Sequence, residues 1–398
     1  MSTPNSYAPP ADIDVRRQRA LYAGAAGLVV CALGFVVDRD HFFRSWLTAY
    51  LLFLGIALGS LALLMVQHLS GGAWGVFRRV FEASSRTLPM MALLFLPIAL
   101  GMSRIYPWTH ADIVQADEVM RHKEPYLNAG FFLIRALVYF AGWIGLAWTL
   151  SRLSKRQDQG ENVSLRLQYW AGGGIVFFAF ATTLAAIDWV MSINPHWFST
   201  LFGFIFIGGQ GISALAFTIV VSTYLSQRAP MESVLKPSHF HDLGKLSLAF
   251  VMLWAYFNFS QYMLTYAANL VEEIPYFIAR ISHGWQYLAL FLVIFQFAVP
   301  FLLLLSRDLK RNPYRLVWVA VALIVVRYID LFMLVAPEFD ATGANVHMLG
   351  GEHESSFYVH WLDLAAPLAV GGLWLWMFFT QLAQRPLLAF ADPHLRDA

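Results

Sequence analysis

Ten long apolar runs follow one another along this 398-residue chain and leave little sequence between them. A run of about 20 apolar residues is long enough to cross a hydrocarbon core about 30 Å thick. Only 13% of the residues are charged, well below the roughly 25% that is usual in soluble domains. The sequence therefore predicts an all-α polytopic membrane protein and excludes a soluble catalytic domain. The ten predicted spans are 20–37, 46–69, 87–103, 127–150, 165–191, 197–225, 245–271, 282–305, 314–337 and 357–382.

The basic residues are unevenly divided between the two sides of these spans. With the N-terminus in the cytoplasm, 19 of the 27 Lys and Arg residues, Arg78 and Arg79 among them, fall on the cytoplasmic side. Such an excess is typical of cytoplasmic loops, and an even number of spans places both termini there. The net charge of +2 is then a matter of topology, and we expect no nucleic-acid partner. Six basic residues fall on the outer side: Arg39, Arg44, Arg104, Arg121, Lys123 and Arg280.

The chain is expected to divide into a cytoplasmic N-terminal tail (1–19), a ten-helix membrane domain (20–384) and a cytoplasmic C-terminal tail (385–398). Its only cysteine, Cys31, cannot hold an iron–sulfur cluster, and no C-x-x-C-H motif for haem c is present. Three of the 12 histidines, His68, His283 and His360, fall within or beside spans, all near span ends. We therefore expect no redox cofactor and no metal in this chain.

Two ionisable residues, Arg327 and Asp330, lie inside the ninth apolar run. A charge at that depth costs about 2.5–3.5 kcal/mol on insertion scales, so a membrane protein rarely keeps one without a use. At a spacing of three residues the two side chains share one helix face, where each can partly neutralise the other.

Other polar residues fall at similar depths in the predicted topology. Asp188, Glu272, Glu273, Asp330 and Asp363 lie in the outer halves of their spans, while Gln261 is near mid-depth and His68 is at an inner end. Two interpretations are open: a charge-compensated network that fixes how the helices pack, or a proton relay. The candidate relay residues are Asp188, Gln261, Glu272, Glu273, Arg327, Asp330, Asp363, Arg135 and His68.

Several short motifs occur in a distinctive order along the chain. They are DWVMSINPHWFST at 188–200, HDLGK at 241–245, FSQYM at 259–263, ANLVEE at 268–273, RYIDL at 327–331 and WLD at 361–363. Together they resemble the NrfD-like (polysulfide-reductase-type) membrane subunits of bacterial alternative complex III, most closely the smaller, ActF-type subunits. The resemblance covers nearly the whole chain.

The resemblance implies a subunit of a quinol-oxidising complex in the bacterial inner membrane that passes electrons to cytochrome c or another acceptor. It implies two four-helix bundles, spans 2–5 and 6–9, flanked by spans 1 and 10. The expected partners are a second NrfD-like subunit, an iron–sulfur subunit, c-type cytochrome subunits and lipids, so that haem c and iron–sulfur clusters lie outside this chain.

Within that family the subunit could conduct protons, or it could bind a quinone and take part in quinol oxidation. The motif residues carried over are Asp188, His196, Gln261, Glu272, Glu273, Arg327, Asp330 and Asp363. A standalone secondary transporter is the third reading that the ten spans and the intramembrane charges allow.

Overall fold

The structure, a computed structural model, describes residues 7–349 and 355–389. Within those ranges it contains no β-strand, and ten helices are long and apolar enough to cross a membrane. The prediction of an all-α, ten-span, multi-pass membrane protein is confirmed. The spans are α1 (Asp12–Val37), α2 (Arg39–Ser70), a third from Trp74 to Leu100, α9 (Ala129–Asp158), α10 (Ser164–Trp189), α11 (Phe202–Leu225), α12 (Pro237–Ala268), an eighth from Trp285 to Leu305, α17 (Pro313–Val335) and α18 (Leu362–Ala383).

Several helices begin earlier than their apolar runs. Helix α1 starts at Asp12, inside the predicted 1–19 tail, and α2 starts at Arg39 although its apolar run begins at residue 46. The Asp38 carboxylate accepts a hydrogen bond from the His41 backbone N–H and so caps α2. Hydropathy locates the apolar middle of a helix, whereas caps of this kind set its ends.

Two spans are interrupted, each beside a proline. The third is divided into α3 (Arg78–Ser85), α4 (Leu88–Leu94) and α5 (Leu96–Leu100), with Pro97 at the start of α5. The eighth runs through α14 (Trp285–Leu292), a π-helical turn (Val293–Ala298) and α15 (Val299–Leu305). Because Pro300 has no N–H to donate to the carbonyl four residues earlier, the regular ladder fails at that turn.

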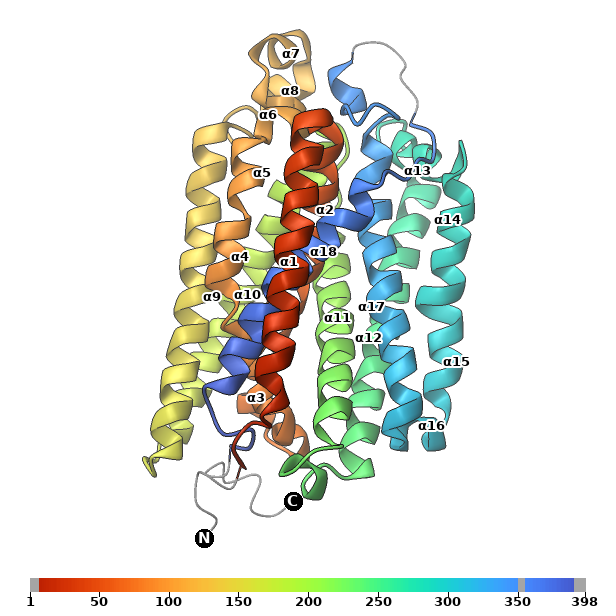
Figure 1. Cartoon of the computed structure of the whole chain (residues 1–398). Helices are drawn as coiled ribbons and strands as arrows, with labels where there is room; N and C mark the ends of the chain where they lie inside the picture. Colours follow the sequence, from red (N-terminus) through yellow and green to blue (C-terminus); the bar gives the residue numbers. More distant parts are fainter. Residues whose placement is uncertain (1–6, 350–354, 390–398) are drawn as a thin grey trace.

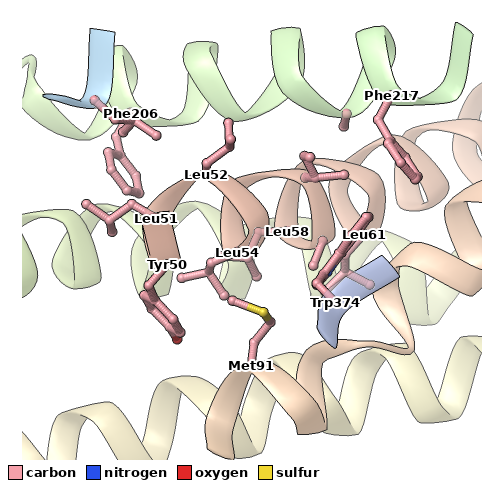
Figure 2. Packing of buried hydrophobic residues seen from close by; sticks show 14 of the residues in the cluster. Tyr50, Leu51, Leu52, Leu54, Leu58, Leu61, Met91, Phe206, Phe217 and Trp374 are labelled. Atoms are coloured by element: carbon pink, nitrogen blue, oxygen red, sulfur yellow. The ribbon is translucent and has the colours of Figure 1, made fainter. Parts of the chain in front are cut away.

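Helix α2 occupies the centre of the molecule (Figure 1). It packs against α11, α18, α10, α3 and α17, and most of the side chains along it are buried. Figure 2 shows Tyr50, Leu54 and Leu58 of α2 among side chains from other helices, including Met91, Phe206 and Trp374. A helix that is apolar on all sides belongs in such a core.

The remaining helices lie on two sides of this centre (Figure 1). The α4–α5 segment, α9 and α10 lie on one side, and α12, α14, α15 and α17 lie on the other. Helices α1 and α18 pair with each other in front. The division into two four-helix bundles with two flanking helices stays a prediction.

The contact between α1 and α18 depends on small residues. A Cβ atom on Gly27 would lie 2.5 Å from the backbone nitrogen of Ala369, and one on Gly24 would lie 2.7 Å from that of Leu373. A Cβ on Gly372 would in turn overlap the backbone of Gly24. Glycine thus lets the two backbones touch, as is common where membrane helices cross.

The chain segments next to the two termini meet at one end of the molecule. The Leu387 backbone N–H donates to the Tyr7 carbonyl over 2.9 Å, and Arg228 pairs with Asp12 at 2.9 Å. We call this the terminal end, and the opposite end, which carries the connecting segments 101–128, 339–349 and 355–361, the loop end. The cytoplasmic placement of the terminal end stays a prediction.

We predict that Gly372→Ala lowers the thermal stability of the protein in detergent. Overpacking of this kind typically costs about 1–3 kcal/mol, because the new methyl group would meet the α1 backbone. Gly145→Ala is the matched control: a Cβ at Gly145, on α9, meets nothing within 4 Å. That change should be neutral or stabilising by up to about 1 kcal/mol. Equal melting temperatures for the two variants would contradict the close α1–α18 contact.

Candidate functional site

Arg135 of α9 and Asp188 of α10 form a bidentate ion pair near the loop end. Arg135 Nε and Nη2 donate to the two carboxylate oxygens over 2.8 and 2.9 Å, and the Tyr139 hydroxyl donates to Asp188 Oδ2 over 2.8 Å. The Asp188 side chain is completely buried. The Arg135 guanidinium also stacks over Tyr126, 3.9 Å from the ring centre. Bidentate pairing holds this carboxylate in one geometry.

The surroundings of Asp188 are aromatic. Trp189 packs against Phe95, Phe140 and Trp143 with ring centres between 4.8 and 5.9 Å apart. The Tyr106 hydroxyl donates to the Trp189 carbonyl over 3.0 Å. Asp188 therefore joins α9 to α10 in closely packed surroundings, which favours the structural interpretation for this residue.

Asp363, at the start of α18, binds Arg44 of α2. Arg44 Nη2 lies 2.6 Å from Asp363 Oδ2, and the Ser45 hydroxyl donates to Oδ1 over 2.5 Å. The Tyr328 hydroxyl of α17 donates to the Asp363 carbonyl over 2.6 Å. The assignment of Arg44 to an outer loop is wrong: α2 extends past its apolar run, so Arg44 is inside the helix and buried.

Arg327 and Asp330 form an ion pair one turn apart within α17, and both are buried. The indole Nε1 of Trp254, on α12, donates to Asp330 Oδ2 over 3.0 Å. The guanidinium lies against Gly209 of α11, where a Cβ atom would overlap it. This pair lies well inside its span, because fourteen residues of α17 precede Arg327 from the terminal end.

A polar stripe, which we define as Trp254, Asn258, Gln261, Thr265 and Glu273, leads from this pair toward the loop end. Its first four members recur every three or four residues and so share one face of α12. Gln261 Nε2 donates to Thr265 Oγ1 over 3.3 Å, and Thr265 Oγ1 donates to Glu273 Oε2 over 3.2 Å. The Ser199 hydroxyl also donates to Gln261 Oε1 over 2.5 Å. Glu272, the neighbour of Glu273, is exposed and off the stripe.

The structure therefore sorts the predicted residues into separate groups. Asp188, Asp330 and Asp363 each bind a different arginine on a different set of helices. Over the described ranges, no hydrogen bond or ion pair joins these three carboxyl groups to one another. Gln261 and Glu273, by contrast, do lie on a common hydrogen-bonded chain.

His68 lies at the terminal end of α2. It is buried, and with Gln67, Arg78 and Gln157 it lines a small cavity of about 20 Å³, about the room that one water molecule needs. The sequence placed Arg78 and Arg79 in a loop on the cytoplasmic side, and this prediction is wrong: both are buried in α3. Both donate to the Glu82 carboxylate, over 2.9 and 2.7 Å, and this pairing lets the basic residues enter the bundle.

A further buried ion pair lies at the loop end between Arg280 and Glu338. Arg280 Nη2 lies 2.8 Å from Glu338 Oε1, and His347 Nε2 lies 2.9 Å from Oε2. Arg280 had been assigned to an outer loop but is buried, because the connection folds back onto α17. Glu338 and His347 border a cavity of about 410 Å³. Burial raises the pKa of the adjacent Tyr276 to about 12, although the charge of Arg280 opposes the shift.

His196, from the 188–200 motif, lies in the connection between α10 and α11. Its Nε2 is 2.5 Å from Asp117 Oδ2, so it ties two loop-end connections together. The pKa of Asp117 lies below its usual value. Partial burial acts to raise this pKa, but the hydrogen bonds from the Met120 backbone N–H and from His196 lower it by more.

Two buried amides were not singled out by the sequence. Gln210 of α11 and Gln296 of the π-helical turn are almost completely buried, and neither has a hydrogen-bond partner for its amide within the described part of the chain. Pro300 is the one feature of the sequence that points to either amide, because it marks the irregular helical turn in which Gln296 lies. Such groups ordinarily require a partner, which makes both sites candidates for internal hydration.

Asp38, His41 and His360 could together hold a metal ion. Their ligand atoms lie within 4.8 Å of one another, and the two imidazole rings stack with centres 4.2 Å apart. Asp38 is also the residue that caps α2, and its Oδ2 lies 2.7 Å from His41 Nδ1, so the structure of the helix end already accounts for the contact between Asp38 and His41. The absence of a metal from this chain stays a prediction.

The chain matches no model of a known protein family, and no curated protein is similar to it in sequence. The resemblance to NrfD-like subunits therefore depends on the ordered motifs alone.

We predict that Arg135→Met destabilises the protein by about 3–5 kcal/mol, because Asp188 would be left buried without its partner. The double variant Arg135→Met/Asp188→Leu should recover most of that loss, since it removes both charges. Thermal unfolding in detergent measures both effects, with Arg121→Met at an exposed position of the short helix Glu118–Lys123 as the control. A double variant as unstable as the single one would show that pairing is not what holds α9 to α10.

Proposed function

We propose that this chain is a membrane subunit of a quinol:cytochrome c, or quinol:acceptor, oxidoreductase of the alternative complex III type. In this proposal it holds no redox cofactor and provides part of a proton path. The ordered motifs support the family, and the polar stripe supports the proton path. The chain would lie in the bacterial inner membrane with both termini in the cytoplasm.

The polar stripe is the observation that carries the proposal. Hydrogen bonds join Glu273, Thr265 and Gln261 at its loop end and Trp254 to Asp330 at its deep end, and Asn258 lies between these two parts on the same helix face. From Thr265 to Trp254 it covers eleven residues, or about 16 Å of helix at 1.5 Å per residue. That is about half of a hydrocarbon core about 30 Å thick. Titratable groups at such depth commonly mark proton routes.

In this proposal Asp188 and Asp363 have a structural role and do not belong to the proton path. Asp188 and Asp363 each accept several hydrogen bonds from fixed donors, so they serve to join helices. Gln261, Glu273, Asp330 and Arg327 form the half-path that opens at the loop end. His68 and its small cavity supply a titratable group at the terminal end, where a second half-path would begin.

Electron transfer would belong to partner subunits. Haem c and iron–sulfur clusters are expected on c-type cytochrome and iron–sulfur subunits, with a second, larger NrfD-like subunit beside this one. The outward faces of α12 and the eighth span carry many exposed apolar side chains, Phe259 and Leu290 among them, and suit contact with a partner helix or with lipid.

A quinone-binding role is the second candidate, and one feature favours it. A groove of about 550 Å³ lies between α12 and the π-helical turn, and its lining includes Trp254, Asn258, Tyr262 and Phe297. It is apolar with few polar groups, which is the usual character of a cofactor pocket. Trp254 links the groove to Asp330, so a quinol bound there would lie beside a proton acceptor.

The transporter alternative is less well supported. Secondary transporters often carry unwound segments at corresponding places in two repeats. The third and eighth spans are interrupted here, but the breaks are single turns of altered helix.

We predict that Asp330→Asn, in the purified complex reconstituted into liposomes, lowers the number of protons moved per electron. Quinol oxidation should be little changed, because no electron carrier is altered. Asp330→Asn alone leaves the buried Arg327 without its carboxylate. The double variant Arg327→Gln/Asp330→Asn removes both charges and so tests the proton-to-electron ratio without a buried, unpaired cation. Glu272→Gln, exposed and off the stripe, is the matched control.

An unchanged proton-to-electron ratio in both variants would rule out the stripe as a path. Loss of quinol oxidation together with the ratio, in an intact complex, would instead favour the quinone-binding role. Recovery of this chain from membranes without haem-bearing or cluster-bearing partners would contradict the assignment to an oxidoreductase complex.

A further inference from the structure

A basic pocket lies at the terminal end between α4, α9 and the segment that follows α18. It has a volume of about 380 Å³, and four cationic side chains line it: Arg86, Arg152, Lys155 and Arg385. Its other lining residues include Ile144 and Trp148 of α9. The polar stripe and the quinone groove both lie on α12, so this basic pocket is a separate feature.

Among the described residues, positive charge in and beside the basic pocket exceeds negative charge. Two acids in the described part of the chain are close: Glu82, which binds Arg78, Arg79 and Arg385, and Asp158, which binds Arg79. Within that part, six cations thus share two carboxylates. Arg86 donates to the neutral amide of Gln384 over 2.8 Å, and Arg385 is close enough for the two guanidinium charges to repel.

The face of α9 that borders the basic pocket changes character along its axis. Ile144, Trp148, Arg152 and Lys155 follow one another at spacings of three and four residues, so they form one row. The row passes from an aliphatic to an aromatic and then to two basic side chains. This is the order of acyl chain, interface and headgroup that a phospholipid presents.

Exposed apolar side chains continue from the basic pocket along the same two spans. Trp148 is 60% exposed, with the Arg152 guanidinium 5.2 Å from its ring centre. Leu93, Leu96 and Leu100 on the third span and Leu137 on α9 are also largely exposed. In a ten-span membrane protein such side chains face acyl chains. A soluble anion would use the cations but would leave this apolar surface without a role.

We propose that the basic pocket binds the headgroup phosphate of an anionic phospholipid, with the acyl chains lying along α4, α5 and α9. Arginine forms charge-assisted, bidentate hydrogen bonds with phosphate oxygens, and basic pockets between membrane helices are suited to such headgroups. The lipid neutralises the excess charge around Glu82. It also links α9 and α4 to Arg385 and so fastens the segment after α18 to the bundle.

Native mass spectrometry of the detergent-purified protein, with added phosphatidylglycerol or phosphatidylcholine, tests the proposal. We expect the wild type to retain phosphatidylglycerol in preference to phosphatidylcholine. Arg152→Gln/Lys155→Gln changes only exposed side chains and is therefore expected to fold. It should bind phosphatidylglycerol roughly 30-fold more weakly, as the loss of two membrane-surface cations implies. Arg86→Gln should weaken binding further.

Arg307→Gln/Arg315→Gln is the matched control, because both residues are exposed basic residues at the terminal end but lie outside the basic pocket. Its phosphatidylglycerol binding should equal that of the wild type. Equal binding by all variants would overturn the proposal. So would protection from thermal unfolding by inorganic phosphate alone, which would indicate a soluble-anion site. Cross-linking of the basic pocket to an acidic partner segment in the intact complex would overturn it as well.

Discussion

The pairing of each buried arginine with a carboxylate is the constraint on which this structure depends. An isolated charge is too costly in a membrane interior, so Arg44, Arg135 and Arg327 can be buried only where an acid meets them. Two of these pairs join different helices, and the third lies within α17 but reaches α12 through Trp254. Helix positions that apolar packing would leave free to slide are thereby fixed, because a shift of one turn would separate the charges.

The buried acids differ in how much freedom their surroundings leave them. Asp188 accepts from Arg135 and Tyr139 within a tightly packed aromatic layer, so its donors fully determine its position. Asp330 accepts from the residue one turn earlier in its own helix and from an indole that belongs to a polar stripe. Similar ion pairs can thus serve different ends: one holds helices together, and the other stands at the inner end of a row of hydroxyl, amide and carboxyl groups.

Much of the fold could be predicted from the sequence, because hydropathy is a local property. The ten apolar runs all became spans, and the charged residues away from the ends of these runs, such as Arg135, Arg327 and Asp330, proved to be buried. Which acid pairs with which buried arginine could not be predicted. Arg44 and Asp363, for example, are 319 residues apart in the sequence, and only the packing of α2 against α18 brings them together. For the same reason the sequence placed Arg44, Arg78 and Arg280 in loops. Gln261 and Glu273 were selected, but their chain through Thr265 depends on how the connection after α12 folds back.

The glycine contact between α1 and α18 has a consequence for how the molecule is made. Helix α1 packs mainly against α18, and its closest neighbours there, Ala369 and Gly372, are synthesised more than 340 residues after Gly24 and Gly27. During translation α1 must therefore enter the bilayer well before its main partner exists. A nascent chain from which α18 has not yet emerged cannot close the front of the bundle.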